Sequence, residues 1–463
     1  MTEEAGHAPG LAALRRRALE PVDVASLAAF RFMFGALMFA GTLRFMLNGW
    51  VERFYVRPTF TFSYWGFEWV ELLSPLWMHA AFVLMAVSAA AVAVGLFYRV
   101  AIVAFFLVFT YVELIDVTNY LNHYVLVSYL SLLMCFLPLH RAWSVDAWRD
   151  PSLRIKSAPA WVVWLLRFQV AVVYVYAGLA KTGSDWLLHA QPLNIWMTAR
   201  VDTPVIGPLL DVWAVALLMS WGGFLYDTTI VGFLLWERTR ALAYVAVIGF
   251  HTLTGLLFNI GMFPVIMITV TPIFFAPGWP RRLLPPRWIE RLDGDAARAW
   301  RPPRRGRALL AAAVAVYVAL QVLVPARWLL YPGDVLWHEQ GMRWAWKVML
   351  REKNGSVTYR VRLPGATRER YVTPSRYLTR HQEREMSGQP DLILQLGQHI
   401  GAELGGEGVE VRVDALVSLN GRAPKRLIDP TVDLMTVRDG VSPADWITEA
   451  PDTPPIRLSR GHP

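Results

Sequence analysis

The stretch WVVWLLRFQVAVVYVYAGLAK, residues 161–181, decides the fold of this chain. It is predominantly apolar over a length that can cross a lipid bilayer as a helix, for which about 20 residues are needed. It then ends on one lysine, Lys181. We interpret it as a membrane span. Any function assigned to the protein has to explain why a lysine lies at the end of this span.

The composition of the whole chain is that of a membrane protein. Of its 463 residues 55% are hydrophobic and only 17% are charged, which is too little polar surface for an ordinary soluble domain. The formal charge of +9 does not indicate nucleic-acid binding, because the basic residues lie in short runs between apolar segments and accompany no nucleic-acid module. The single cysteine, Cys135, excludes a disulfide framework within the chain.

Apolar windows long enough to be spans recur along the first 331 residues. We therefore predict a mainly α fold, a polytopic helical membrane domain with about nine spans. The predicted spans are residues 22–46, 77–97, 101–116, 122–139, 161–180, 212–235, 240–258, 262–277 and 308–331. The windows 101–116 and 262–277 are short and can be tilted or partly re-entrant.

Basic residues in the connections predict the orientation. Arginines cluster in 15–17 and in 281–307, on one side of the predicted spans, whereas few basic residues lie on the other side. This bias predicts a cytoplasmic N-terminal tail (1–21), a transmembrane domain (22–331) and an extracytoplasmic C-terminal part. The arginine-rich loop and the high alanine content favour a bacterial plasma (inner) membrane.

The C-terminal part changes character and reads as a small α+β domain, residues 332–450. The sequence MRWAWKVMLREKNGSVTYRVRLPG alternates on both sides of Asn354-Gly355, which predicts a hairpin there. PDLILQLGQHIGAEL predicts an amphipathic helix, and a second strand pair flanks Asn420-Gly421. Residues 451–463 are expected to form a flexible tail.

Polar side chains at membrane depth are the candidate site. Lys181 lies at the outer edge of its span, and His251 lies in the outer half of another. Asn119, Asn122 and His123 would share one helix face if their helix starts early. Ionisable groups in a bilayer are costly and mark functional sites by default. No nucleophile elbow, phosphate loop, dinucleotide motif or metal-ligand spacing accompanies them.

The residues alone leave a plainer interpretation open for each of these side chains. A lysine at a helix end often extends to the lipid headgroups, and Lys181 can be such an anchor. A single histidine such as His123 or His251 can be a hydrogen-bonded packing residue.

Several segments resemble the vitamin K-dependent gamma-glutamyl carboxylase family, whose membrane domain is shared with the broader horizontally transferred transmembrane (HTTM) domain proteins. The membrane segments PTFTFSYWGFEWV, NHYVLVSYL, AGLAKTGSDW and FHTLTGLLFNIGMF occur in the order of that family. WAWKVMLREKNGSVTYRV and VSLNGRAPKRLIDPTVDL are similar to its lumenal domain. The resemblance covers roughly residues 25 to 440.

This resemblance implies a function and roles for the candidate residues. A member of the family couples oxygenation of reduced vitamin K, a phylloquinone or menaquinone hydroquinone, to carboxylation of peptide glutamate, with O2 and CO2 as co-substrates and no metal. Lys181 would be the base toward the hydroquinone, and His123 would assist the glutamate carbanion step. Asn122 would orient a reactant, His251 would support it, and Arg426 is a candidate contact for a substrate carboxylate. The partners would be a lipid quinone, a glutamate-containing peptide or protein, and the bilayer.

Departures from the family keep alternatives open. Animal members have a lysine pair where this chain has Ala180-Lys181, and they have a disulfide and a longer C-terminal region. The chain can therefore be a quinol epoxidase or oxidoreductase without peptide carboxylation. It can also be a non-enzymatic membrane binding or immunity protein of the broader family.

Overall fold

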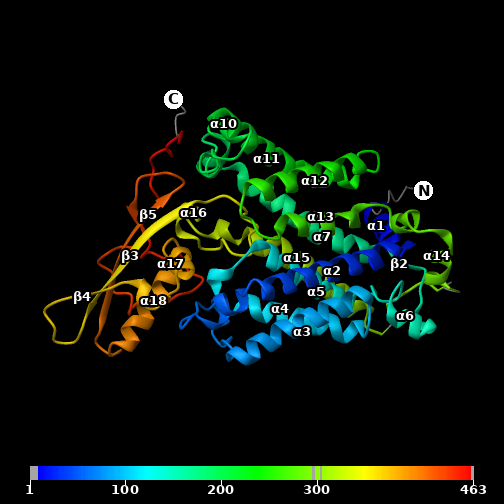
Figure 1. Ribbon diagram of the computed structural model, residues 1–463, viewed down its shortest axis with the longest axis horizontal. Helices are drawn as coiled ribbons and strands as arrows, with labels where there is room; N and C mark the ends of the chain where they lie inside the picture. Colours follow the sequence, from blue (N-terminus) through cyan, green and yellow to red (C-terminus); the bar gives the residue numbers. More distant parts are fainter. Residues whose placement is uncertain (1–8, 295–297, 303–304, 460–463) are drawn as a thin grey trace, which may run out of the picture.

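The computed structural model describes residues 9–294, 298–302 and 305–459. A layer of long helices fills one part of the molecule, and a small α+β domain lies at one end of these helices (Figure 1). Among the described residues, six helices are long and apolar enough to cross a membrane. They are α2 (Ala25–Leu47), α3 (Pro75–Val94), α7 (Trp161–Leu179), α11 (Trp213–Leu235), α12 (Arg240–Leu257) and α15 (Arg307–Ala326).

Three shorter apolar helices correspond to the remaining predicted spans. They are α4 (Tyr98–Leu114), α5 (Asn122–Phe136) and α13 (Phe263–Val270), which continues as a 3-10 turn to Phe274. The predicted mainly α membrane domain is thus confirmed, and the expected count of about nine spans agrees roughly with six long helices and three short ones. The helix at Asn122 does not start early. Leu121 is extended and Asn119 belongs to a separate 3-10 turn, so the expected single face of Asn119, Asn122 and His123 is wrong.

Helix α3 shows how a span ends inside a packed bundle. Pro75 stands at its first position, where no intrahelical N–H is needed, and Gly95 ends it with φ +68°. Buried Arg31 of α2 donates to the carbonyl oxygens of Val92 (3.0 Å) and Ala93 (2.7 Å). The guanidinium therefore satisfies carbonyls that the last helical turn leaves free, and it places a cation at the negative end of the helix dipole.

Short elements close the end of the helices that lies opposite the α+β domain. Strands β1 (Pro21–Asp23) and β2 (Ser157–Pro159) pair antiparallel, and Arg281 bonds to Asp23 and Asp293. The helices α1 (Pro9–Leu19), α6 (Val145–Arg149) and α14 (Pro286–Asp293) lie at this end in Figure 1. The arginine-rich connections therefore gather on one side of the helix layer, as the predicted topology requires.

The α+β domain is built on a four-stranded antiparallel sheet in the order β4-β3-β5-β6. The long pair is β3 (Lys353–Arg362) and β5 (Glu410–Leu419), which match along their full length. Helix α18 (Pro390–Glu403) confirms the predicted amphipathic helix and packs against β5. Strand β4 (Arg370–Val372), helices α16 (Val335–His338) and α17 (Arg380–Met386), and β6 (Lys425–Arg426) complete the domain.

One predicted hairpin is confirmed and the other is wrong. Asn420 and Gly421 turn the chain from β5 into β6, with Leu416 opposite Arg426. Asn354 and Gly355, in contrast, lie inside β3 opposite Ser418 and Val417. The glycine is needed here for space, because a Cβ at position 355 would collide with the carbonyl oxygen of Ser387.

The two parts of the molecule are joined by polar contacts. Asp185 of α8 (Ser184–Leu187) accepts from Arg422 at 2.6 and 2.7 Å and from Asn420 at 2.8 Å. Asp116, between α4 and α5, accepts from Gln382 at 2.9 Å. The Trp344 N–H donates to the Tyr120 hydroxyl at 2.7 Å. The α+β domain, which we call the outer domain, is thus fixed to the segments that precede α5 and follow α7.

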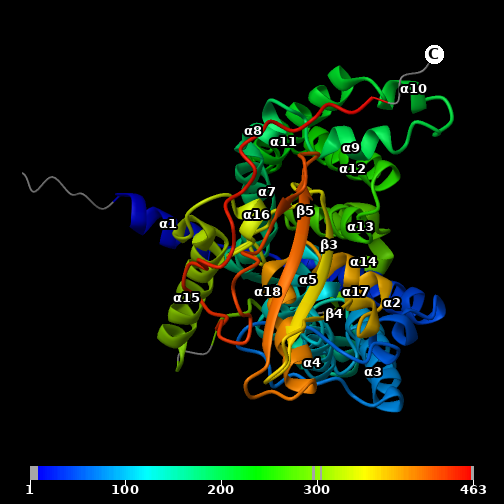
Figure 2. The ribbon, with the colours of Figure 1, turned by 90° about the vertical axis from the view of Figure 1, so that its left-hand side faces the viewer.

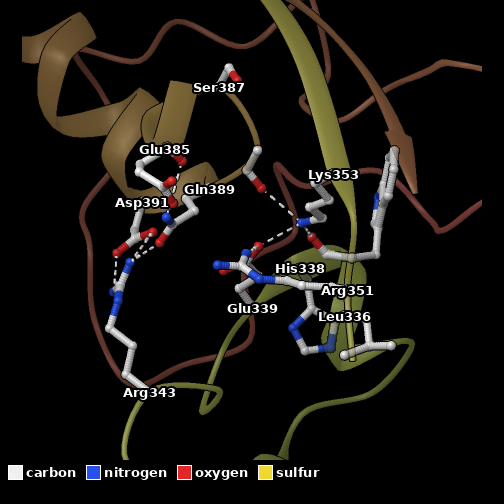
Figure 3. A network of polar contacts seen from close by, with 12 residues as sticks. Leu336, His338, Glu339, Arg343, Arg351, Lys353, Glu385, Ser387, Gln389 and Asp391 are labelled. Carbon is white, nitrogen blue, oxygen red and sulfur yellow. Dashed lines mark hydrogen bonds and ion pairs between the residues drawn. The ribbon is translucent and has the colours of Figure 1, made fainter. Parts of the chain in front are cut away.

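The buried side chain of Lys353 in β3 joins separate segments of the outer domain (Figure 3). Lys353 donates to the carbonyl oxygens of Trp337 (2.6 Å) and Gly388 (2.8 Å) and to Glu339 (2.8 Å), which also contacts Arg351. Burial lowers the pKa of Lys353 well below its ordinary value, and neighbouring Arg351 adds to this. The lysine holds α16, β3 and the α17–α18 connection together.

Replacing Lys353 with methionine should destabilise the outer domain. The change leaves Glu339 and two carbonyl oxygens buried without this donor, and breaking a buried pair from one side costs about 3–5 kcal/mol. Denaturant unfolding in nanodiscs, followed by tryptophan fluorescence, measures the free energy. The matched control is Lys425→Met, an exposed lysine of the same sheet, with an expected change within about 0.5 kcal/mol. Equal losses in both variants would contradict the role of the network.

The Asp185–Arg422 contact should stabilise docking down to acidic pH. Burial raises the pKa of Asp185, but hydrogen bonds from Arg422 and Asn420 outweigh this and hold it below its ordinary value. A depressed carboxyl pKa contributes stability that is present above the unfolded pKa of about 3.9 and is lost as pH falls through the folded value. The difference in melting temperature between wild type and Asp185→Asn should therefore be constant from neutral pH to about pH 4 and shrink below it. A difference that shrinks near neutral pH would assign the pH dependence to other groups.

Candidate active site

Lys181 is buried inside the helix layer. It follows α7 in a 3-10 turn, Ala180–Thr182, and is 5% exposed. Its Nζ donates to the Asp227 carboxylate at 2.8 Å and to the Ala177 carbonyl oxygen at 3.2 Å. Nζ also lies 5.1 Å from the centre of the Trp186 ring. The amine is therefore buried in the protein and paired with a carboxylate.

Asp227 is the functional candidate that the sequence interpretation missed. It is the one charged residue of α11, and it is buried where α11 packs against α7. A Cβ at Gly178 would approach Thr228 within 2.7 Å, so glycine permits this close helix contact. A lone aspartate in an otherwise apolar span was the available signal, because such a residue needs a partner within the bundle.

Lys181 and Asp227 line a small cavity together with His251. The cavity has a volume of about 60 Å³, and its walls include Tyr174 and Trp186. His251 Nε2 lies 3.1 Å from the Tyr174 hydroxyl, and its Nδ1 is buried without a hydrogen-bond partner in the described structure. Lys181 and His251 thus line the same cavity. A volume this small holds diatomic or triatomic molecules and no aromatic ring system.

His123 lines a second and larger cavity of about 380 Å³. It lies in the first turn of α5, edge-on to Tyr124, and Gly261 approaches its Cε1 and Nε2 atoms. Its wall carries a group of aromatic side chains, which include Phe45, Trp50, Phe54, Tyr55, Phe82 and Phe109. Ligand pockets of this kind have volumes of about 300–1,000 Å³. The cavity is therefore large enough for a bicyclic aromatic headgroup.

Glu113 is a second acidic residue that the sequence interpretation did not select. It lies in α4, is buried, and lines the same cavity as His123. The Ser128 hydroxyl donates to its Oε2 at 2.7 Å. An acidic residue in an apolar helix was again a visible signal, but its proximity to His123 depends on how α4 packs against α5.

Phe263 lines the smaller cavity and lies close to both candidate histidines. Its ring centre lies 6.0 Å from that of His123 and 5.7 Å from that of His251. The polar residues expected at membrane depth thus divide into two groups, Lys181 with His251 in the smaller cavity and Asn119 with His123 in the larger one.

The two remaining predicted site residues line neither cavity. Asn122 accepts from the Tyr120 hydroxyl at 3.0 Å, and that hydroxyl in turn accepts from the Trp344 N–H. Arg426 lies on β6 with its side chain 59% exposed, 3.9 Å from Asp414. Asn122 therefore supports the loop above His123, and Arg426 lies on the surface of the outer domain. In the described residues no group of three His, Cys, Asp or Glu side chains is placed to hold a metal ion.

Comparison with known families agrees with this two-part arrangement. The HTTM domain model matches residues 19–279, more than half of the chain, and the lumenal domain model of vitamin K-dependent gamma-carboxylase matches residues 306–453. The chain belongs to the vitamin K-dependent gamma-glutamyl carboxylase family. The first match contains most of the residues that line the two cavities, to which the second region adds Val348 and Met349 in one cavity and His381 and Glu385 in the other. The second match supports an extracytoplasmic location for the outer domain. No solved structure was found to match the chain.

The Lys181–Asp227 pair predicts a distinctive pattern of stability. Lys181→Met or Asp227→Leu alone leaves one charge buried without its partner, which should cost about 3–5 kcal/mol. The double variant removes both charges, so thermal unfolding in nanodiscs should show most of that loss restored. Additive losses in the double variant would show that the two side chains stabilise the bundle independently.

Proposed function

We propose that this protein is an integral membrane carboxylase that couples oxygenation of reduced vitamin K to γ-carboxylation of peptide glutamate. When bound, the vitamin K hydroquinone supplies with oxygen the strong base that glutamate deprotonation requires, and it leaves as the 2,3-epoxide. The observation that carries the proposal is the buried Lys181–Asp227 pair beside an aromatic cavity that contains His123.

The larger cavity fits the headgroup of a lipid quinone. Its volume and its aromatic wall suit a planar bicyclic ring, which the Lys181 cavity is too small to hold in the present arrangement. The residues that would hold the ring are Phe45, Phe82, Phe109 and Tyr124, with His123 and Glu113 as polar contacts. Phe263 would have to move for the ring to reach Lys181.

Asp227 makes Lys181 usable as a base. An ammonium group cannot accept a proton, so Lys181 must first lose one, and the Asp227 carboxylate at 2.8 Å is positioned to take it. Transfer converts a buried ion pair into a neutral pair, and the apolar surroundings reduce the cost of that step because they stabilise charges poorly. The lysine would then accept a proton from a hydroquinone hydroxyl.

His123 is positioned to move a proton in the larger cavity. Its imidazole lies at the outer end of α5, close to the loop that the outer domain covers. A peptide glutamate that enters from the outer domain would meet this cavity first. His123 would hold or deliver a proton at Nε2, and Asn122 would support the loop through Tyr120.

The test is a double-product assay with Lys181→Ala. Protein in nanodiscs receives reduced vitamin K, oxygen, labelled bicarbonate and a short glutamate-containing peptide, and epoxide and fixed label are scored separately. Loss of a general base lowers rates about 10²- to 10⁴-fold, so both products should fall by at least about 100-fold. Lys156→Ala, an exposed lysine at the end of the helices opposite the outer domain, is the matched control and should retain both activities.

The other outcomes separate the alternatives. Epoxide without fixed label in the wild type would indicate a quinol epoxidase and remove peptide carboxylation from the proposal. Neither product from well-folded protein, with the quinone shown to be reduced, would leave the Lys181–Asp227 pair a structural contact in a binding protein.

A further inference from the structure

Residues 451–459, which we call the strap, follow the membrane-domain surface that faces the outer domain. The strap is drawn in red in Figure 2, where it crosses from the outer domain over α8 and α9 (Leu193–Thr198) toward α10 (Gly207–Leu210). Its sequence, PDTPPIRLS, has three prolines and no regular secondary structure. Most of its side chains are exposed, and Pro455 is buried. Apolar burial therefore contributes little to holding it.

Two buried amide side chains, Gln191 and Asn194, hold the strap by its backbone. Gln191 Nε2 donates to the Ile456 carbonyl oxygen at 2.8 Å. Asn194 forms a two-bond contact with Leu458, in which its Nδ2 donates to the carbonyl oxygen at 3.0 Å and its Oδ1 accepts from the N–H at 2.8 Å. Both amides are 0% exposed. Every one of these bonds ends on a backbone atom of the strap. The hydrogen bonds of the amide pair therefore do not depend on the side chains of the segment that it holds.

Two further contacts hold the strap, one at Thr453 and one at Arg457. Arg422 Nε donates to the Thr453 carbonyl oxygen at 2.7 Å, while the same guanidinium bonds to Asp185. The Arg457 guanidinium lies 3.8 Å from the centre of the Trp213 ring. The segment is thus held extended between the β5–β6 turn and the start of α11.

The amide pair lies directly behind the Lys181 cavity. Trp186 and Leu193, from the same segment that contains Gln191 and Asn194, line that cavity. An extended chain on the amide pair therefore passes on the outer side of the segment that forms the cavity wall. Nearby Lys425 and Arg426 of β6 are exposed cations, which complement a glutamate-containing chain.

We propose that Gln191 and Asn194 form a backbone-recognition site for an extended segment of the peptide substrate, and that the strap occupies this site as an intramolecular competitor. The inference rests on the proposed function for the identity of the peptide. Backbone-directed bonds suit an enzyme that must accept glutamates in different sequences, because affinity then comes from the main chain. The strap is tethered, so it competes at a high effective concentration, on the order of millimolar.

Peptide binding without turnover tests the site. The probe is a fluorescein-labelled PDTPPIRLS peptide, measured by anisotropy in nanodiscs against full-length protein and a variant that stops after Ala450. We expect the shortened variant to bind at least about tenfold more tightly, because its amide pair is free. Adding Asn194→Ala to the shortened variant should weaken binding about tenfold or more. Asn48→Ala, whose exposed amide bonds only to Arg44 of its own helix, is the matched control and should change nothing.

A second measurement uses the full-length chain and so does not depend on folding of the shortened one. The Leu458 amide is bonded to Asn194, and its hydrogen exchange should accelerate when a glutamate-containing peptide is added at millimolar concentration. Unchanged exchange at Leu458, or equal anisotropy for Asn194→Ala and its parent, would overturn the proposal.

The two proposals fail in different ways. Asn194-dependent peptide binding with no fixed carbon would retain the backbone site and reject carboxylation. Fixed carbon with peptide binding that ignores Asn194 would retain the carboxylase and reject this site.

Discussion

A charged side chain inside an apolar helix layer must find a partner within the protein, and this constraint explains how the bundle is arranged. Lys181 is paired with Asp227, Arg31 with the last carbonyl oxygens of α3, and Glu113 with the Ser128 hydroxyl. Each pair joins two different helices, α7 with α11, α2 with α3, and α4 with α5. The polar contacts therefore specify which helices are neighbours, because a wrong pairing would leave a charge in lipid.

Two of these contacts lie in the two different cavities of the interior. The pair at Lys181 lies in a small cavity, and the pair at Glu113 lies in the wide aromatic cavity of His123. The Phe263 ring lies close to a histidine of each cavity. Under the proposed function, cavities of different size could admit a large lipid headgroup and small gas molecules separately.

The outer domain contacts the membrane domain next to both cavities. Asp185 lies four residues after Lys181, and Tyr120 lies three residues before His123; both are bonded to the outer domain. Displacement of the outer domain would therefore pull on the ends of α5 and α7, where the two candidate catalytic side chains lie. Under the proposed function, peptide binding to the outer domain would act on both cavities through these short connections.

The sequence by itself determined the spans and the small α+β domain with its α18 helix and second hairpin, and it selected Lys181, His123 and His251 as candidates, because apolar length and isolated polar residues are local properties. It could also have indicated Asp227 and Glu113, which are single acidic residues in apolar helices. Only the tertiary structure decided that Asp227 reaches Lys181, that Lys181 and His123 line different cavities, and that Arg426 lines neither, because these facts depend on how the elements pack. The turn predicted at Asn354-Gly355 failed for the same reason. Gly355 is needed because a larger residue would collide with the backbone of Ser387, 32 positions further along the chain. No local sequence pattern contains that contact.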